Sequence, residues 1–220
     1  MGLIESVNVG VVRPAVSTPG RSGIDKVPTA GPVAVDVPGA GRSGLAGDPI
    51  CDTDFHGGPD QAVYAYARED LEAWGPTLGP LRAGTFGENL TTRGVDVTDA
   101  RIGERWRVGD DVVLQVTVPR TPCRTFAAWL GRTGWVRTFT EAAVPGAYLR
   151  VLLPGTVRAG DRVVVLDRPD HDVTIGLVFR AVTREPELLP RLLPALDALP
   201  DDVRARVRRR LDGRSVVGNP

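Results

Sequence analysis

Cys123 stands between a predicted strand and a predicted helix. Residues 112–118 are rich in valine, which predicts a strand, and apolar residues at helical spacing follow Cys123. Thr121 offers a hydroxyl that can cap a helix, and Pro122 fits the first helical position. The pattern therefore predicts that Cys123 lies in the first turn of a helix.

That position would favour the thiolate form of Cys123. The first turn of a helix presents free N–H groups and the positive end of the helix dipole, and Arg120 and Arg124 flank the thiol in sequence. Each feature lowers the pKa of a thiol, and a thiolate is a nucleophile or a ligand for a soft metal. The alternative is that Cys123 is a small buried apolar residue.

A second segment suited to chemistry is the turn His56-Gly57-Gly58-Pro59-Asp60. Its adjacent glycines free the backbone for left-handed geometry, and successive N–H groups in such a turn bind anions. His56 is placed to transfer a proton or to contact a substrate. A histidine that makes only a structural hydrogen bond is the alternative.

A third segment is the run Phe86-Gly87-Glu88-Asn89-Leu90, which two threonines follow. It predicts a tight turn with amide and hydroxyl donors, although a plain β-turn with local side-chain caps fits as well. The sequence shows no glycine-rich nucleotide loop after a strand, no P-loop and no Ser-His-Asp signature. We therefore expect no flavin-binding or nicotinamide-binding domain in this chain.

Composition narrows the class of protein. Lysine plus arginine and aspartate plus glutamate number 27 each, which argues against nucleic acid as a partner. Two cysteines, Cys51 and Cys123, are too few for a disulfide framework or a zinc cage, and we interpret Cys51 as structural. The sequence opens without a signal-peptide pattern and contains no apolar stretch of about 20 residues, so we expect a cytoplasmic protein without a membrane span.

Short strand patterns separated by turn residues dominate the first three quarters of the chain. We expect strands over residues 2–12, 24–28, 33–37, 62–66, 103–108, 112–118, 147–153 and 162–166, with helices over 68–74, after Cys123 and over 134–143. Residues 38–60 form a long Gly/Pro/Asp-rich connection, which is typical of a functional loop. The pattern predicts a mainly β fold with helices, a closed barrel over residues 1–168.

The pattern changes after Arg168. Leucines and valines recur at helical spacing, but Pro190 and Pro194 interrupt them, which predicts short helices. A last helix begins near Asp201 and ends in an arginine-rich run that complements the helix dipole. We expect residues 169–220 to form a separate helical tail.

Five short blocks of the sequence together resemble the MOSC family, named for the C-terminal domain of molybdenum cofactor sulfurases. In family order they are Gly23-Ile24-Asp25-Lys26-Val27-Pro28, Gly44-Leu45-Ala46-Gly47-Asp48, His56-Gly57-Gly58-Pro59-Asp60, Phe86-Gly87-Glu88-Asn89-Leu90 and Pro119-Arg120-Thr121-Pro122-Cys123. The chain is most similar to the stand-alone bacterial branch, which includes reductases of 6-hydroxylaminopurine. The resemblance covers most of residues 3–166.

The resemblance implies a MOSC-type (pyruvate-kinase-like) β-barrel followed by a small C-terminal three-helix domain. It also implies a molybdenum-dependent oxidoreductase that reduces N-hydroxylated compounds, with Cys123 donating a sulfur to the molybdenum of molybdopterin and His56 taking part in catalysis. The candidate cofactor contacts are Lys26, His56, Gly57, Gly58, Asp60, Glu88, Asn89, Arg120 and Arg124. For Lys26 and Arg124 the alternative is an exposed charge without a role in binding.

Other properties follow from the same resemblance. A flavoprotein or a ferredoxin-type protein would donate the electrons. Pyridoxal phosphate is not expected, because nothing in the chain corresponds to the domain that binds it in fused sulfurases. Two alternatives stay open: a sulfur carrier that holds a persulfide on Cys123, and a non-catalytic barrel that binds a small molecule.

Overall fold

The computed structural model describes residues 2–15, 20–39, 42–54 and 56–217. Its strands are β1 (Gly2–Pro14), β2 (Arg21–Pro28), β3 (Val33–Val35), β4 (Val63–Ala67), β5 (Leu90–Arg93), β6 (Arg105–Val108), β7 (Val112–Pro119), β8 (Ala147–Leu153), β9 (Gly155–Val157) and β10 (Arg162–Asp167). Its α-helices are α1 (Arg68–Ala73), α2 (Gly75–Leu78), α3 (Arg124–Leu130), α4 (Trp135–Ala142), α5 (Ile175–Thr183) and α6 (Asp201–Val217), and its 3₁₀ segments are η1 (Pro59–Gln61) and η2 (Pro186–Ala198).

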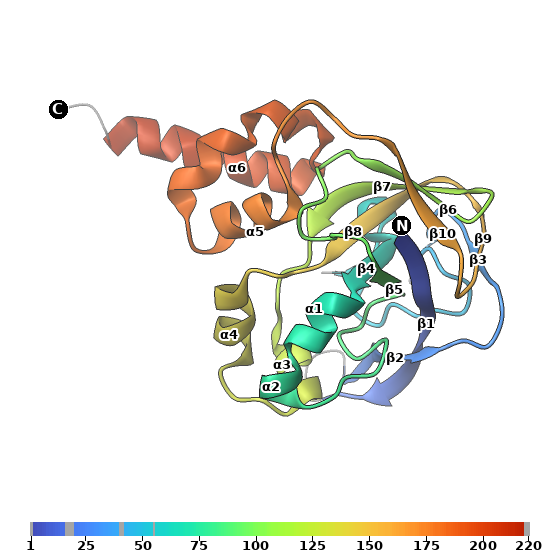
Figure 1. Cartoon of the computed structure of the whole chain (residues 1–220). Helices are drawn as coiled ribbons and strands as arrows, with labels where there is room; N and C mark the ends of the chain where they lie inside the picture. Colours follow the sequence, from blue (N-terminus) through green and yellow to red (C-terminus); the bar gives the residue numbers. More distant parts are fainter. Residues whose placement is uncertain (1, 16–19, 40–41, 55, 218–220) are drawn as a thin grey trace.

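Seven of the strands in the described residues close into a barrel, in the order β10-β6-β7-β8-β4-β5-β1 (Figure 1). The barrel closes because β10 and β1, the two ends of this strand order, pair with each other, with Gly2 opposite Val163 and Leu3 opposite Arg162. Every neighbouring pair is antiparallel except β4 and β5, which run parallel, so the barrel is mixed. The predicted β-barrel with several helices is confirmed.

The first strand, β1, serves two sheets at once. Its first half pairs with β5 and β10 inside the barrel, whereas its second half pairs with β2, from Asn8 opposite Pro28 to Pro14 opposite Arg21. This second half therefore carries β2, with Ser22 and Lys26, beyond the barrel wall. The ribbon formed by β1 and β2 makes one side of the pocket described below.

An aromatic cluster lies beside the barrel and fixes the helix that follows Cys123. Phe126 of α3 is fully buried and meets Phe86, Trp135 and Phe139 at ring-centroid distances of 5.1, 5.5 and 5.3 Å. Edge-on aromatic pairs of this kind are each worth about 1 kcal/mol beyond the area that they bury. The start of α3 is thereby held against the 84–90 segment.

The helical tail packs directly on the barrel (Figure 1). The Val173 carbonyl accepts from Ile102 N–H at 3.0 Å, and Ile175 N–H donates to the Ala100 carbonyl at 2.9 Å. Val178 of α5 is fully buried in the same hydrophobic cluster as the barrel interior. The expected boundary near residue 168 stays a prediction, but the two parts share one apolar core.

Candidate functional site

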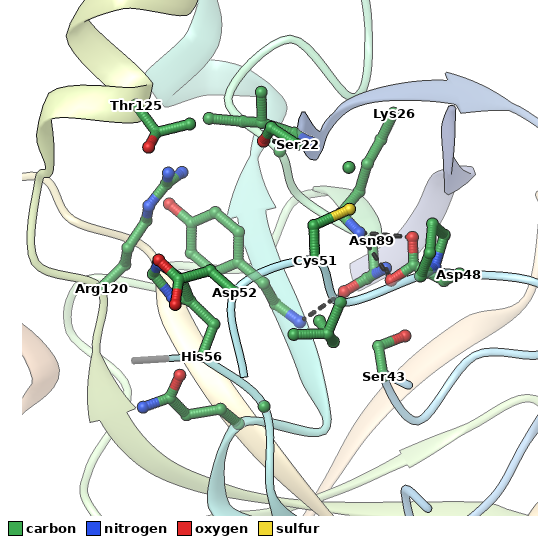
Figure 2. A pocket seen from close by; sticks show the side chains of 18 of the residues that line it. Ser22, Lys26, Ser43, Asp48, Cys51, Asp52, His56, Asn89, Arg120 and Thr125 are labelled. Atoms are coloured by element: carbon green, nitrogen blue, oxygen red, sulfur yellow. Dashed lines mark hydrogen bonds and ion pairs between the residues drawn. The ribbon is translucent and has the colours of Figure 1, made fainter. Parts of the chain in front are cut away.

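The three sequence segments singled out above converge on one pocket at the end of the barrel (Figure 2). The pocket encloses about 750 Å³, its open mouth included, which is the size range of small-molecule sites. Its walls come from β2, from the 43–57 loop, from the 87–89 turn and from the segment between β7 and α3. Six of the predicted site residues line it: Lys26, His56, Gly57, Asn89, Arg120 and Cys123.

Cys123 is the N-cap residue of α3. Its backbone is extended, with φ −133° and ψ 171°, and its carbonyl accepts the first helical hydrogen bond, from Ala127 N–H at 3.1 Å. The sequence predicted a helix capped by Thr121 that already contained Cys123, so the helix begins later than expected. The thiol nevertheless lies at the helix N-terminus, where backbone N–H groups are free.

The surroundings of Cys123 favour its thiolate. Burial raises the pKa of Cys123, but the His56 side chain, the Arg120 charge and the Phe126 backbone N–H together lower it from 9.0 to about 6. Most of the Cys123 population is therefore deprotonated at neutral pH. The pocket presents a soft, negatively charged sulfur beside a histidine.

Arg120 is a buried cation beside Cys123. Its side chain is only 5% exposed, and its guanidinium lies 4.2 Å from the Phe126 ring centroid and 5.2 Å from that of Tyr64. One terminal nitrogen donates to the Phe86 carbonyl, whereas the buried Nε has no hydrogen-bond partner among the described residues. Such a side chain is held rigidly and retains capacity to bind an anion.

Lys26 also lines the pocket, but its charge is already paired. The ammonium donates to both carboxylate oxygens of Asp48, at 2.5 and 2.6 Å, and both side chains are buried. Asn89 donates to Asp48 at 2.9 Å and accepts from Tyr64 N–H at 3.1 Å. Burial lowers the pKa of Lys26 despite the Asp48 carboxylate. This network ties β2, the 43–48 segment and β4 together under the pocket (Figure 2).

Glu88 lies behind the pocket wall. Its carboxylate is fully buried and accepts from Gly84 N–H at 2.5 Å, Phe86 N–H at 3.0 Å and the Thr91 hydroxyl at 2.9 Å. Burial raises the pKa of Glu88, although these donors oppose the rise. The residue shapes the turn that carries Gly87 and Asn89 into the pocket.

The remaining predicted contacts lie further out. Gly58 and Asp60 line a second hollow, between the barrel and the tail, and the Asp60 carboxylate accepts from Arg150 Nε at 2.7 Å. Arg124 is exposed and lines neither this hollow nor the pocket.

Several pocket residues were not identified from the sequence. Cys51 and Asp52 line the pocket from the Gly/Pro/Asp-rich loop, as Figure 2 shows, and Tyr64 and Tyr148 line it from β4 and β8. The length of that loop was a usable signal for Cys51, which stands five residues before His56. Nothing in the strand patterns distinguished the two tyrosines from ordinary core residues.

The described residues form neither a metal-binding cluster nor a membrane-spanning helix. They contain no group of three or more histidine, cysteine, aspartate or glutamate side chains arranged to hold a metal ion. Nor does any helix in this part of the chain combine the length and the apolar character needed to cross a membrane.

Comparison with known proteins assigns a family. The family model of the MOSC domain matches residues 52–164. The crystal structure of YiiM from Geobacillus stearothermophilus superposes with a TM-score of 0.78 at 27% identity, covering 96% of this chain and 100% of that one. This match includes the tail.

Two curated relatives match over part of their length. The uncharacterized protein YflK of Bacillus subtilis is 35% identical over 140 residues, which cover 63% of this chain and 63% of that protein. A protein of Gibberella moniliformis named "Reductase" is 30% identical over 165 residues, 70% of this chain but 29% of the fungal protein. The chain thus spans less than two thirds of either relative.

Proposed function

The chain belongs to the MOSC domain family, and we propose that it is a reductase that binds the molybdenum cofactor and removes oxygen from N-hydroxylated compounds such as hydroxylaminopurines. The family and the relative named as a reductase support a reductase in general. The observation that carries the proposal is Cys123, a thiolate at neutral pH that faces a pocket beside the buried Arg120.

The residues of the pocket fit this cofactor. A soft thiolate suits molybdenum, and the described residues offer no cluster of protein ligands besides it, which matches a metal whose other sulfurs come from the dithiolene of molybdopterin. The unpaired Nε of Arg120 and the left-handed turn at Gly57, with φ 92°, supply donors for the anionic part of the cofactor. Lys26 supports the pocket wall through its ion pair with Asp48 and offers no free charge to the cofactor.

The bound cofactor would supply two electrons to the N–O bond of the substrate. Cys123 would hold the metal, and Arg120 would bind the negative charge of the cofactor. His56 stands beside the thiolate and can give one of the two protons with which the leaving oxygen departs as water, while solvent gives the other. A separate flavoprotein or ferredoxin-type protein would renew the electrons.

Replacing Cys123 tests this proposal. Protein made in cells that synthesise the cofactor should contain molybdenum and should reduce 6-hydroxylaminopurine when an electron donor is added. Cys123→Ser replaces the soft donor by a hydroxyl and should lose the metal and the activity together. Cys51→Ser, at the other thiol of the pocket, is the control variant and should keep both the molybdenum and the activity. Full activity of Cys123→Ser would refute the mechanism, and a persulfide on Cys123 without molybdenum would indicate a sulfur carrier.

A further inference from the structure

A groove leads out of the Cys123 pocket along α3. It lies between the end of the β1–β2 ribbon and this helix, and it encloses about 480 Å³, its open mouth included. Three residues line both the groove and the Cys123 pocket: Ser22 and Ile24 of β2 and Thr125 of α3. Figure 2 shows Ser22 and Thr125 at the upper end of the pocket. The two spaces are therefore continuous, and one molecule can occupy both.

Apolar side chains form most of the wall of this groove. They are Pro14, Ala15, Ile24, Ala128 and Trp129. Arg13 is the one charged residue among the described residues that line the groove, and its Nε donates to the Asp25 carboxylate at 3.0 Å. Because its only charge is already paired, the groove favours an uncharged apolar group.

Two of the apolar side chains are held in place from behind. The indole Nε1 of Trp129 donates to the Thr85 carbonyl at 2.8 Å, and Trp129 and Ile24 both pack against the aromatic cluster beside the barrel. A Cβ added to Gly87 would lie 3.0 Å from Ile24 Cγ1, so Ile24 also packs tightly on that turn. The groove is therefore preformed, and a ligand that enters it pays little for reorganisation.

The spaces around the groove have the opposite character. The Cys123 pocket presents the buried Arg120 cation and His56, which suit polar and anionic groups. The second hollow, between the barrel and the tail, has the ion pair of Asp202 and Arg206 on its wall. An apolar substituent on a molecule bound beside Cys123 therefore finds its most favourable surroundings in the groove.

We propose that this groove binds an apolar substituent of the substrate, so that the preferred N-hydroxylated compounds carry an alkyl or aryl tail. The N–O group lies beside Cys123, and the tail passes Ser22 and Thr125 toward Trp129. The chemistry of this substrate rests on the function proposed above, but the binding of its tail does not require turnover. Ala128 and Trp129 thereby select among N-hydroxylated compounds by the length and polarity of the tail.

The experiment measures binding by calorimetry, with full-length protein from cells that make the molybdenum cofactor. The probes are N-butylhydroxylamine and N-octylhydroxylamine. Four further methylenes in a half-open apolar groove should make the octyl compound bind at least about tenfold more tightly. Ala128→Phe fills the groove and Ala128→Asp places a charge in it, both from an exposed position, and each should reduce this advantage to less than about twofold. Ala142→Phe, the same change at an exposed site of α4 outside both spaces, should keep the advantage.

Equal binding of the two probes to the wild type would overturn the proposal, as would an octyl advantage that survives in both Ala128 variants. Loss of molybdenum from both variants, with native melting curves, would also overturn it, because the groove would then hold part of the cofactor. Molybdenum content and reduction of N-butylhydroxylamine separate the two proposals. Ala128-dependent octyl binding to a wild type without molybdenum or turnover would refute the reductase and retain the groove. An active, molybdenum-loaded wild type without a preference for the longer chain would refute the groove alone.

Discussion

Replacing His56 by leucine should return Cys123 to a more ordinary thiol. The pKa of about 6, against 9.0 for an unperturbed cysteine, corresponds to about 4 kcal/mol in favour of the thiolate at ~1.4 kcal/mol per pKa unit. Burial opposes that shift, so His56, Arg120 and the Phe126 N–H must together supply more than this amount. Loss of the histidine should raise the pKa of Cys123 by about one and a half units.

The effect on alkylation changes sign with pH. At pH 6 the thiolate fraction should fall from about one half to roughly 3%, whereas at pH 9 both proteins are almost fully ionised. A thiolate of higher pKa is also intrinsically more nucleophilic, by about fivefold for one and a half units. The variant should therefore react with iodoacetamide about threefold more slowly at pH 6 and about fourfold faster at pH 9.

The assay is the rate of Cys123 alkylation from pH 5 to 10 in cofactor-free protein that carries Cys51→Ser, so that a single thiol reacts. His171→Leu is the matched control, because His171 lies at the start of the tail outside the pocket, and its rate profile should follow that of the parent. Parallel profiles for His56→Leu and the parent, without a crossing, would show that His56 does not stabilise the thiolate.

Two substitutions test the scaffold of the pocket by urea unfolding. Asp48→Asn leaves the buried Lys26 ammonium without its counter-charge and should lower the free energy of unfolding by about 3–5 kcal/mol. Adding Lys26→Met should restore at least half of the lost stability. No recovery in the double variant would contradict this account. Gly84→Ala places a Cβ against the Lys26 carbonyl at φ +82° and should lower the free energy of unfolding by more than about 2 kcal/mol. The control Gly131→Ala, at φ +61° in open space, should lower it by only about 1 kcal/mol. Equal losses in the two variants would show that the contact at Gly84 is unimportant.

The barrel strands could be predicted from the sequence because short runs of valine, tyrosine and leucine stand between turn residues. The predicted strands at 62–66, 112–118 and 147–153 correspond to β4, β7 and β8 with small shifts at their ends. By contrast, β5 was missed, because its four residues follow a turn and carry two threonines that also fit a loop. Its parallel pairing with β4 depends on barrel closure, which no local pattern contains.

Residues of the candidate site could be predicted from the sequence where a local motif determines the backbone conformation. Gly57, with φ 92°, and the cysteine at the start of a helix are local features, and both line the pocket. The pairing of Lys26 with Asp48 and the burial of Glu88 were not readable, because they depend on which strands meet in the fold. For Cys51 the length of the Gly/Pro/Asp-rich loop was the one local signal.

Barrel closure through Gly2 and Val163 has a consequence for how the protein is made. The strand that completes the barrel, β10, is the last of the strands to leave the ribosome. Because β1 leaves before the other strands, its edge for β10 stays unpaired until then. Contacts this distant in sequence form slowly, and an edge left open during synthesis is exposed to wrong partners. The nascent chain is therefore most vulnerable to aggregation until residue 163 is free to pair, and chaperone demand should fall sharply once it does.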